Sequence, residues 1–313
     1  MIKPKILVIA GPTATGKTTL GVMVAKAVNG EIVSADSMQI YKNMDIGTAK
    51  PTTQEMSAVP HHMIDVAPPW DDYSVARYVK EAGEIVDDIH HRGKLPVIVG
   101  GTGLYIDSLI SGRTFIVRGD SKLRQTLESR YDTIGGDKML EELRKIDPAG
   151  ADKLFPNDKK RIVRAFEAFN TSGGKPLSVH DAETKAHPPK YDYIKYILSY
   201  KDRSVLYNNI NNRVDTMLSK GLEKEVASLL EMGVSQSCTS MQAIGYKEML
   251  EAVSGKLPLN EAVEKIKMES RRLAKRQLTW FRRDAAARWL LWDDAPDFTG
   301  ATKQITGELY EAK

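Results

Sequence analysis

The residues whose types and spacing best fit chemistry lie near the start of the chain, in GPTATGKT at residues 11–18. The spacing matches G-x-x-x-x-G-K-[ST], a pattern in which backbone amides and a helix N-terminus surround phosphate groups. Lys17 would add a positive charge, and Thr18 could bind a phosphate oxygen or Mg²⁺. The pattern therefore indicates a polyphosphate site, but it does not identify what the phosphates are attached to.

Asp36 is the second candidate, because it ends the apolar run EIVSAD at 31–36. A nucleoside triphosphatase normally has an acid at the end of a second core strand, where it helps to hold Mg²⁺. The strand-like run LPVIVGG at 95–101 ends in glycines instead. Asp36 could therefore hold a metal in a kinase-like enzyme, act as a general base, or cap a turn.

The elements that must position these residues follow an alternating pattern. Short apolar runs at 5–10, 31–36 and 95–101 predict buried parallel strands, and helical spacing of apolar residues follows at 16–28 and 75–89. The alternation predicts an α/β fold with a P-loop NTPase-like parallel sheet flanked by helices. Ligands of such sheets bind at the carboxyl ends of the strands, where Asp36 and the loop both fall.

The middle of the chain changes character. Residues from about 118 to 187 are charged and carry three helical patterns, at 121–131, 138–146 and 157–173, before a strand pattern returns at 193–200. We therefore expect a helical insertion domain at 118–187 within a catalytic core formed by 1–117 and 188–313. A basic segment at 271–283 is either an exposed amphipathic helix or a backbone contact for RNA.

Composition narrows the classes. The 313-residue chain has a net charge of only +4, so a nucleic-acid partner is permitted but not demanded. A single cysteine, Cys238, excludes a Cys-rich zinc finger and suits the reducing cytoplasm. His61 and His62 have no partners at zinc spacing, so we expect no zinc site. Without a long apolar run or a leader before Ile6, we expect no membrane association and a cytoplasmic location.

Several motifs together resemble the tRNA dimethylallyltransferases, also called tRNA isopentenyltransferases, of the bacterial type. They are GPTATGKT, SADSMQIYKNMDIGTAKP, HHMID, VGGTGLYI, PNDKKRIVRAFE, AIGYKE and KRQLTWFR, in that order along nearly the whole chain. The resemblance implies transfer of a dimethylallyl group from dimethylallyl diphosphate to N6 of adenosine 37 in tRNA, with Mg²⁺ as cofactor. The loop would then hold a leaving group rather than a nucleotide.

The resemblance also implies roles for individual residues. Asp36 would accept the N6 proton, Arg213 would neutralise the departing diphosphate, and Thr102 would touch the tRNA. The diphosphate would bind the loop, which consists of Gly11, Pro12, Thr13, Ala14, Thr15, Gly16, Lys17 and Thr18, with Thr18 also the metal ligand. The adenine would border Asp36, Ser37, Met38 and Gln39. The rest of the tRNA would contact Lys160, Arg161, Ile162, Val163 and Arg164.

Two other classes of function compete with this reading. An ATP-dependent small-molecule or nucleotide kinase would use the same loop to turn over ATP. A non-catalytic tRNA-binding protein would have no need of a complete phosphate loop. The glycine end of the 95–101 strand and the basic helical insertion favour the transferase.

Overall fold

The structure is a computed structural model that describes residues 3–116 and 121–311. The chain divides into two compact units, one formed by 1–112 with 190–313 and the other by 113–189. These bounds lie a few residues outside the 118–187 expected from the sequence. Each unit has its own core of buried side chains and is described by itself.

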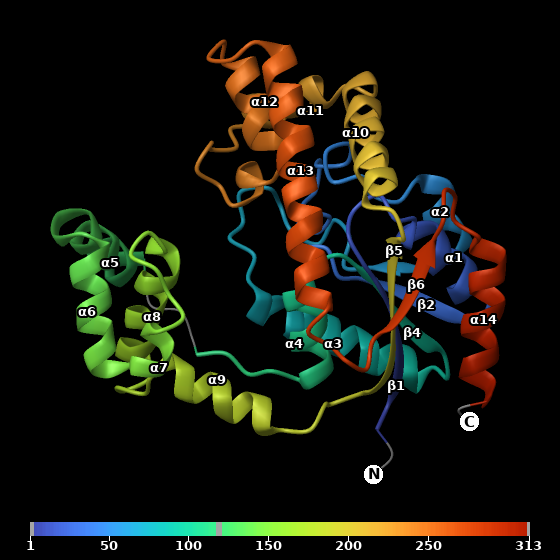
Figure 1. The fold of residues 1–313 in the computed structure, drawn as a ribbon, viewed down its shortest axis with the longest axis horizontal. Helices are drawn as coiled ribbons and strands as arrows, with labels where there is room; N and C mark the ends of the chain where they lie inside the picture. The colour runs from blue at the N-terminus through green and yellow to red at the C-terminus, as the bar shows by residue number, and fades with distance from the viewer. Residues whose placement is uncertain (1–2, 117–120, 312–313) are drawn as a thin grey trace. The chain divides into compact units, whose positions relative to one another are not determined.

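The first unit is built on one parallel sheet (Figure 1). Its strands in chain order are β1 Lys5–Ala10, β2 Gly30–Ser34, β3 His61–His62, β4 Leu95–Gly100, β5 Asp192–Tyr200 and β6 Arg288–Trp292. Their order in space is β3-β2-β4-β1-β5-β6, and every neighbouring pair is parallel. The chain therefore places β1, and the phosphate loop that follows it, in the middle of the sheet.

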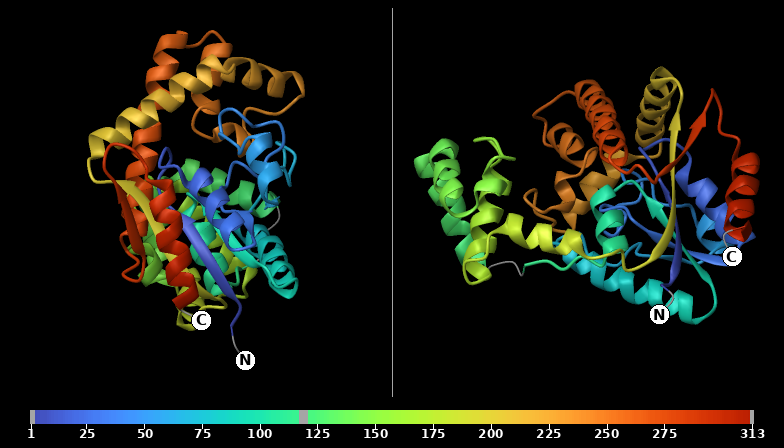
Figure 2. Two further views of the ribbon diagram at one scale, coloured as in Figure 1. Left: turned by 90° about the vertical axis from the view of Figure 1, so that its right-hand side faces the viewer. Right: turned by 60° about the horizontal axis from the view of Figure 1, so that its bottom comes forward.

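Alternate residues of β1 serve opposite faces of the sheet, as the two-residue period of a strand requires. Ile6 and Val8 join one buried cluster, and Leu7 and Ile9 join the other. The first cluster is covered by α3 Val75–His91 and α4 Gly103–Ser111, and the second by α1 Lys17–Ala27 and α14 Phe298–Glu311. Figure 2 shows α14 beside α1.

The remaining helices of this unit follow β5 and pack on one another, α13 lying against both α10 and α12. They are α10 Arg203–Ser219, α11 Leu222–Glu231, the 3₁₀ turn η1 Ser240–Gln242, α12 Tyr246–Val253 and α13 Leu259–Phe281. The short helix α2 Thr53–Ala58 begins with a capping box between Thr52 and Glu55. No helix in the described part of the chain is long and apolar enough to cross a membrane.

The second unit is helical throughout its described residues. It contains α5 Ser121–Ile134, α6 Gly136–Ile146, α7 Pro148–Ala151, α8 Lys159–Thr171 and α9 Leu177–Ala186. The three helical patterns at 121–131, 138–146 and 157–173 are confirmed as α5, α6 and α8. Their apolar stripes meet in a small core that includes Met139, Leu143 and Ile162.

The four strands and two helices predicted for the first unit are also confirmed, to within a few residues at the ends. Asp36 lies beyond β2, which ends at Ser34. The strands β3 and β6 were not predicted. β3 has two residues, and β6 is partly exposed with the sequence RWLLW, so neither shows the continuous apolar run of a central strand.

Candidate active site

The phosphate loop lies between β1 and α1 and depends on two glycines. Gly11 has φ 145°, and a Cβ there would lie 2.4 Å from the carbonyl oxygen of Leu198. Gly16 adopts a left-handed φ of 81°, and a Cβ there would lie 2.6 Å from the ring of Phe298. Glycine is required at both positions because the backbone conformation and the close neighbours exclude a side chain. The loop is thereby held against β5 and α14.

The loop is also braced from within. The Thr15 hydroxyl is buried and donates to the Pro12 carbonyl at 2.9 Å, while Trp292 Nε1 donates to the Thr15 carbonyl at 3.0 Å. Lys17 Nζ donates to the same Pro12 carbonyl at 2.6 Å. Thr15 was predicted among the diphosphate ligands, but its hydroxyl serves the loop itself, which leaves its backbone amide for a ligand.

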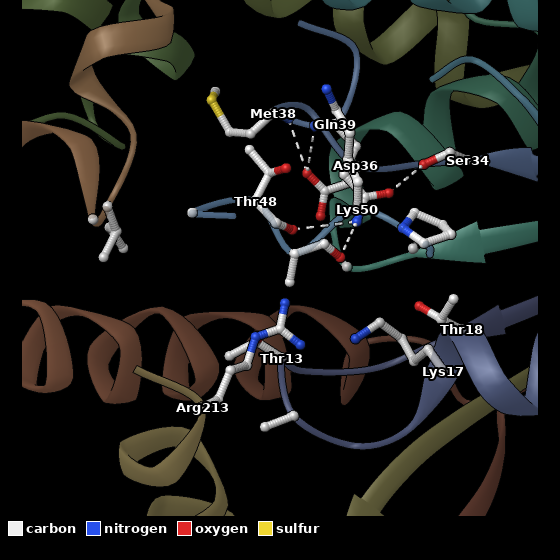
Figure 3. A pocket seen from close by; sticks show the side chains of 18 of the residues that line it. Thr13, Lys17, Thr18, Ser34, Asp36, Met38, Gln39, Thr48, Lys50 and Arg213 are labelled. Atoms are coloured by element: carbon white, nitrogen blue, oxygen red, sulfur yellow. Dashed lines mark hydrogen bonds between the residues drawn. The ribbon is translucent and has the colours of Figure 1, made fainter. Parts of the chain in front are cut away.

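The loop forms one wall of a cavity of about 530 Å³. The other walls come from the Asp36 turn after β2, the segment 47–51, the carboxyl end of β4, and residues of α10 and α13. Figure 3 shows Lys17 and Arg213 pointing toward one another from the loop and from α10, with Asp36 across the space. The structure therefore brings together three predicted residues that are 19 to 196 positions apart in the chain.

Two basic side chains, Lys17 and Arg213, meet in this cavity, and neither forms an ion pair with a carboxylate of the described residues. Burial, followed by the positive charge of Arg213, lowers the pKa of Lys17 from 10.5 to about 7, although Asp36 opposes both effects. Burial also lowers the pKa of Arg213. Arg213 makes no hydrogen bond or ion pair with any residue that the structure describes. Two positive groups held in a partly dry pocket create a site that favours a multiply charged anion.

Asp36 is held by its own turn. Its Oδ1 accepts from the backbone amides of Met38 at 2.9 Å and Gln39 at 3.3 Å. No described group donates to its Oδ2, and the residue lines the cavity. The turn fixes the direction of the carboxylate, so one oxygen is left to accept a proton or a hydrogen bond from a ligand. From the sequence, Asp36 could either cap a turn or act as a catalytic base. The geometry allows both roles, because Oδ1 caps the turn and Oδ2 is left for a ligand.

Thr102 supports the Asp36 turn. Its Oγ1 accepts from the Ser37 amide at 3.1 Å, and its own amide donates to the Ala35 carbonyl at 3.1 Å. Thr102 is not among the residues that line the cavity, whereas Ser37 is. The predicted contact of Thr102 with tRNA remains a prediction.

Met38 and Gln39 also line the cavity, and each has neighbours of its own. Gln39 Nε2 donates to the carbonyls of Thr48 and Ala49 at 3.3 and 3.2 Å, and its Oε1 accepts from the Ser34 hydroxyl at 3.1 Å. The Gln39 carboxamide thus ties the Asp36 turn to the opposite wall. The Met38 side chain is partly buried and packs against the first core cluster.

That opposite wall was missed by the sequence analysis. Glu225 of α11 accepts from the amides of Asp45 and Ile46 at 2.8 Å each and of Gly47 at 3.1 Å, and from the Tyr246 hydroxyl at 2.6 Å. The Tyr246 ring leaves no room for a side chain at Gly47, where a Cβ would lie 2.4 Å away. The motif AIGYKE contains Tyr246, but its partner Glu225 has no local signal because the contact is made across the fold.

Gln277 of α13 was missed as well. Its Oε1 accepts from the Thr13 amide at 3.2 Å, and its Nε2 donates to the Gly101 carbonyl at 2.9 Å. The side chain therefore joins the phosphate loop to the end of β4 and lines the cavity. The motif KRQLTWFR did offer a signal, because Gln277 is an uncharged amide side chain within a basic segment.

The basic segment 271–283 has two faces. Ala274, Leu278 and Phe281 are buried, and Trp280 Nε1 donates to Asp107 at 2.7 Å. The side chains of Lys275, Arg276 and Arg282 are exposed on the other face of α13. Its description as an amphipathic helix is confirmed, and contact with RNA remains a prediction for the exposed face.

The predicted RNA contacts at 160–164 lie on α8 of the helical unit. Lys160 and Arg161 are exposed. Arg164 donates to Glu167 at 2.7 Å and to the Ile116 carbonyl at 2.6 Å, and so braces the unit. Ile162 and Val163 are 0% and 2% exposed in the core of the unit, so their predicted side-chain contact with RNA is wrong. The helical period places them on the inner face of α8, opposite the two exposed cations.

Metal binding by protein groups alone is not indicated in the described residues, where no three His, Cys, Asp or Glu side chains gather. His62 Nε2 pairs with Glu31 at 2.8 Å, and His61 Nδ1 bonds the Val59 carbonyl at 2.8 Å. Thr18 lines the cavity with its hydroxyl unbonded to any described residue. Mg²⁺ usually takes one or two protein oxygens together with phosphates and waters, and this site can supply that set.

Fold and site together define a class. A parallel sheet with a phosphate loop after its central strand, facing one carboxylate and a second cation, is the core of a P-loop-containing transferase. A family model described as IPP transferase matches residues 39–284, and one described as isopentenyl transferase matches residues 4–66. A tRNA dimethylallyltransferase of Caldanaerobacter subterraneus subsp. tengcongensis is 50% identical over 93% of this chain and 92% of its own. One from Carboxydothermus hydrogenoformans is 49% identical over 91% of each chain.

Solved structures agree. The tRNA isopentenylpyrophosphate transferase of Bacillus halodurans matches with a TM-score of 0.72 and 41% identity, over 99% of this chain and 98% of that one. A eukaryotic dimethylallyltransferase acting on tRNA matches with a TM-score of 0.83 and 30% identity, over 99% and 80%. This chain belongs to the tRNA dimethylallyltransferase family, which makes it a prenyltransferase-type enzyme with a P-loop NTPase-like fold. The kinase alternative is not favoured.

Proposed function

We propose that the protein transfers the dimethylallyl group of dimethylallyl diphosphate to N6 of adenosine 37 in tRNAs, in the cytoplasm. The observation that carries the proposal is that Lys17, Arg213 and Asp36 share one cavity, with two basic groups that form no ion pair on one side and a carboxylate oxygen on the other. The cations suit a diphosphate leaving group, and the carboxylate suits a nucleophile that must lose a proton.

The diphosphate would bind at the N-terminus of α1, where backbone amides and the helix dipole favour anions. Lys17 would leave the Pro12 carbonyl and pair with a phosphate oxygen, and Arg213 would approach from α10. Thr18 would hold Mg²⁺ together with diphosphate oxygens. Bound there, the ion would supply additional positive charge against the developing diphosphate.

The reaction forms a C–N bond and an O–H bond, and it breaks a C–O bond and an N–H bond. N6 of the adenine attacks the allylic carbon, and the bond from that carbon to the diphosphate oxygen breaks, with the electron pair leaving on the diphosphate. The N6 proton passes to Asp36 Oδ2, the carboxylate oxygen that the turn leaves free. The adenine amine is a weak nucleophile whose proton becomes acidic during attack, so a fixed base lowers the barrier.

The acceptor base must leave its stack to reach this carbon. A cavity of about 530 Å³ has room for one base and a five-carbon chain but not for a duplex. Adenosine in a single-stranded loop costs least to extrude. Lys160 and Arg161 of the helical unit are exposed cations that suit the phosphate backbone of that RNA.

The decisive experiment uses tRNA that lacks the modification. Incubation with dimethylallyl diphosphate and Mg²⁺, followed by mass spectrometry of the nucleosides, should yield N6-(dimethylallyl)adenosine from position 37. A tRNA with guanosine at that position is the matched control and should yield none. Absence of product from the adenosine tRNA, or turnover of ATP in its place, would overturn the proposal.

A further inference from the structure

The phosphate loop has one amide that is already occupied. Thr13 N donates to Gln277 Oε1 at 3.2 Å, on the strand side of the loop. The amides of Gly16, Lys17 and Thr18 lie at the N-terminus of α1, where a helix offers them no carbonyl partner of its own. Gln277 comes from α13, 264 positions away from Thr13 in the chain.

The orientation of the Gln277 carboxamide is fixed by chemistry at both ends. The Thr13 amide can only donate, so it must meet the carboxamide oxygen, and the Gly101 carbonyl can only accept, so it must meet the nitrogen. A rotation that presented the NH₂ group to the loop would break both hydrogen bonds. The loop therefore always faces a carbonyl oxygen at this end.

Gly101 makes this arrangement possible. A Cβ at Gly101 would lie 2.4 Å from Gln277 Nε2, so a side chain there would expel the carboxamide. We call the Gln277 carboxamide with its hydrogen bonds to Thr13 and Gly101 the bridge. It depends on Gln277 and on the absence of a side chain at Gly101.

We propose that Gln277 is a specificity-determining residue that limits the phosphate loop to two phosphates. In loops of this pattern the backbone amides hold two phosphates, and the lysine reaches toward a third. Lys17 Nζ lies 2.6 Å from the Pro12 carbonyl, directly before Thr13, so a third phosphate would come to this end of the loop. Here that position meets the Gln277 carbonyl oxygen, whose partial negative charge repels a phosphate oxygen, and the Thr13 amide that could have bound it is taken. The bridge admits diphosphate esters and disfavours nucleoside triphosphates. The inference rests on the proposed function, since it concerns the same site.

The test compares two inorganic anions, diphosphate and tripolyphosphate, by isothermal titration calorimetry in the presence of Mg²⁺. The wild-type protein should bind diphosphate more tightly than tripolyphosphate. Gln277→Ala frees the Thr13 amide and removes the repelling oxygen, so the ratio of the two affinities should fall by about tenfold, roughly the effect of one hydrogen bond to a charged group.

Two further variants guard the result. Gln277→Asn, which withdraws the carboxamide by one methylene, should lower the ratio in the same direction. Thr279 lies on the same helix, and its hydroxyl donates to the Lys275 carbonyl. The control variant Thr279→Ala should leave the ratio of the two affinities unchanged. Equal affinities in the wild type, or an unchanged ratio in folded Gln277→Ala, would overturn the inference. Failure of the wild type to bind diphosphate would instead overturn the proposed function.

Discussion

The ammonium group of Lys17 folds back on its own loop and donates to the Pro12 carbonyl at 2.6 Å, with no carboxylate in contact. The acceptor is an uncharged carbonyl rather than a carboxylate, so the contact offsets only part of the cost of burying the ammonium charge. The low pKa of Lys17, about 7, reflects that cost. A bound diphosphate would provide the missing charge, and two measurable consequences follow for the empty and the filled site.

Binding of dimethylallyl diphosphate should take up protons. The free protein holds Lys17 partly neutral above pH 7, and an adjacent anion raises the pKa of that amine again. The last phosphate pKa of such an ester is roughly 6. The charge of the ligand is therefore constant between about pH 7.5 and 9. Affinity should therefore fall as the pH rises across this range. Calorimetry in two buffers of different ionisation enthalpy measures the uptake, and an affinity independent of pH would contradict this assignment.

Removing the amine should stabilise the empty protein under acidic conditions. The pKa of Lys17 is lower in the folded state than its ordinary 10.5, so the unfolded chain binds more protons between pH 7 and 10.5. At pH 6 the buried charge of Lys17 lowers the free energy of unfolding. That free energy rises again as the pH increases from about 7 to 10.5. Lys17→Met should raise the melting temperature at pH 6 and have a smaller effect at pH 9. An equal shift at both values would show that packing, not charge, is responsible.

Asp36→Asn should separate the two functions of this side chain. The asparagine oxygen can still accept from the amides of Met38 and Gln39, so the turn survives, but the group no longer accepts a proton. The transfer rate should fall by about 10²- to 10⁴-fold, the usual contribution of general base catalysis, with tRNA affinity retained. Single-turnover assays with labelled dimethylallyl diphosphate measure the rate. A near-normal rate would remove Asp36 from the mechanism, and Asp36→Ala should lose at least as much.

The two faces of α8 should respond differently. Arg161→Ala removes an exposed cation, so tRNA affinity should weaken and the slope of log affinity against log salt should fall by about one. Lys160→Gln should have the smaller effect of the two. Ile162→Ala opens the core of the helical unit and should cost about 2–5 kcal/mol of stability there. Filter binding at several salt concentrations and chemical denaturation distinguish these outcomes. Weaker tRNA binding by Ile162→Ala at every salt concentration, with its stability unchanged, would place that residue at the RNA.

The contacts of Gln277 and Glu225 show where prediction from sequence stops. Both residues are ordinary polar positions on amphipathic helices, and their partners at Thr13 and Gly47 lie 264 and 178 positions away. Hydrogen bonds over such separations depend on how α11 and α13 pack, and no local pattern encodes that packing. The error at Ile162 and Val163 has a local cause, because a whole motif was treated as RNA-binding although the helical period divides it between two faces.

The sequence by itself determined the phosphate loop, the parallel sheet, the helical insertion and the family. These follow from spacing and periodicity over short stretches, where backbone geometry is set by neighbouring residues. Only the tertiary structure decided that Arg213 stands opposite Lys17, that Asp36 keeps one oxygen free, and that Gln277 closes one end of the loop. Each of these depends on long-range packing of α10, α13 and the turn after β2, which brings distant side chains within a few ångströms of one cavity.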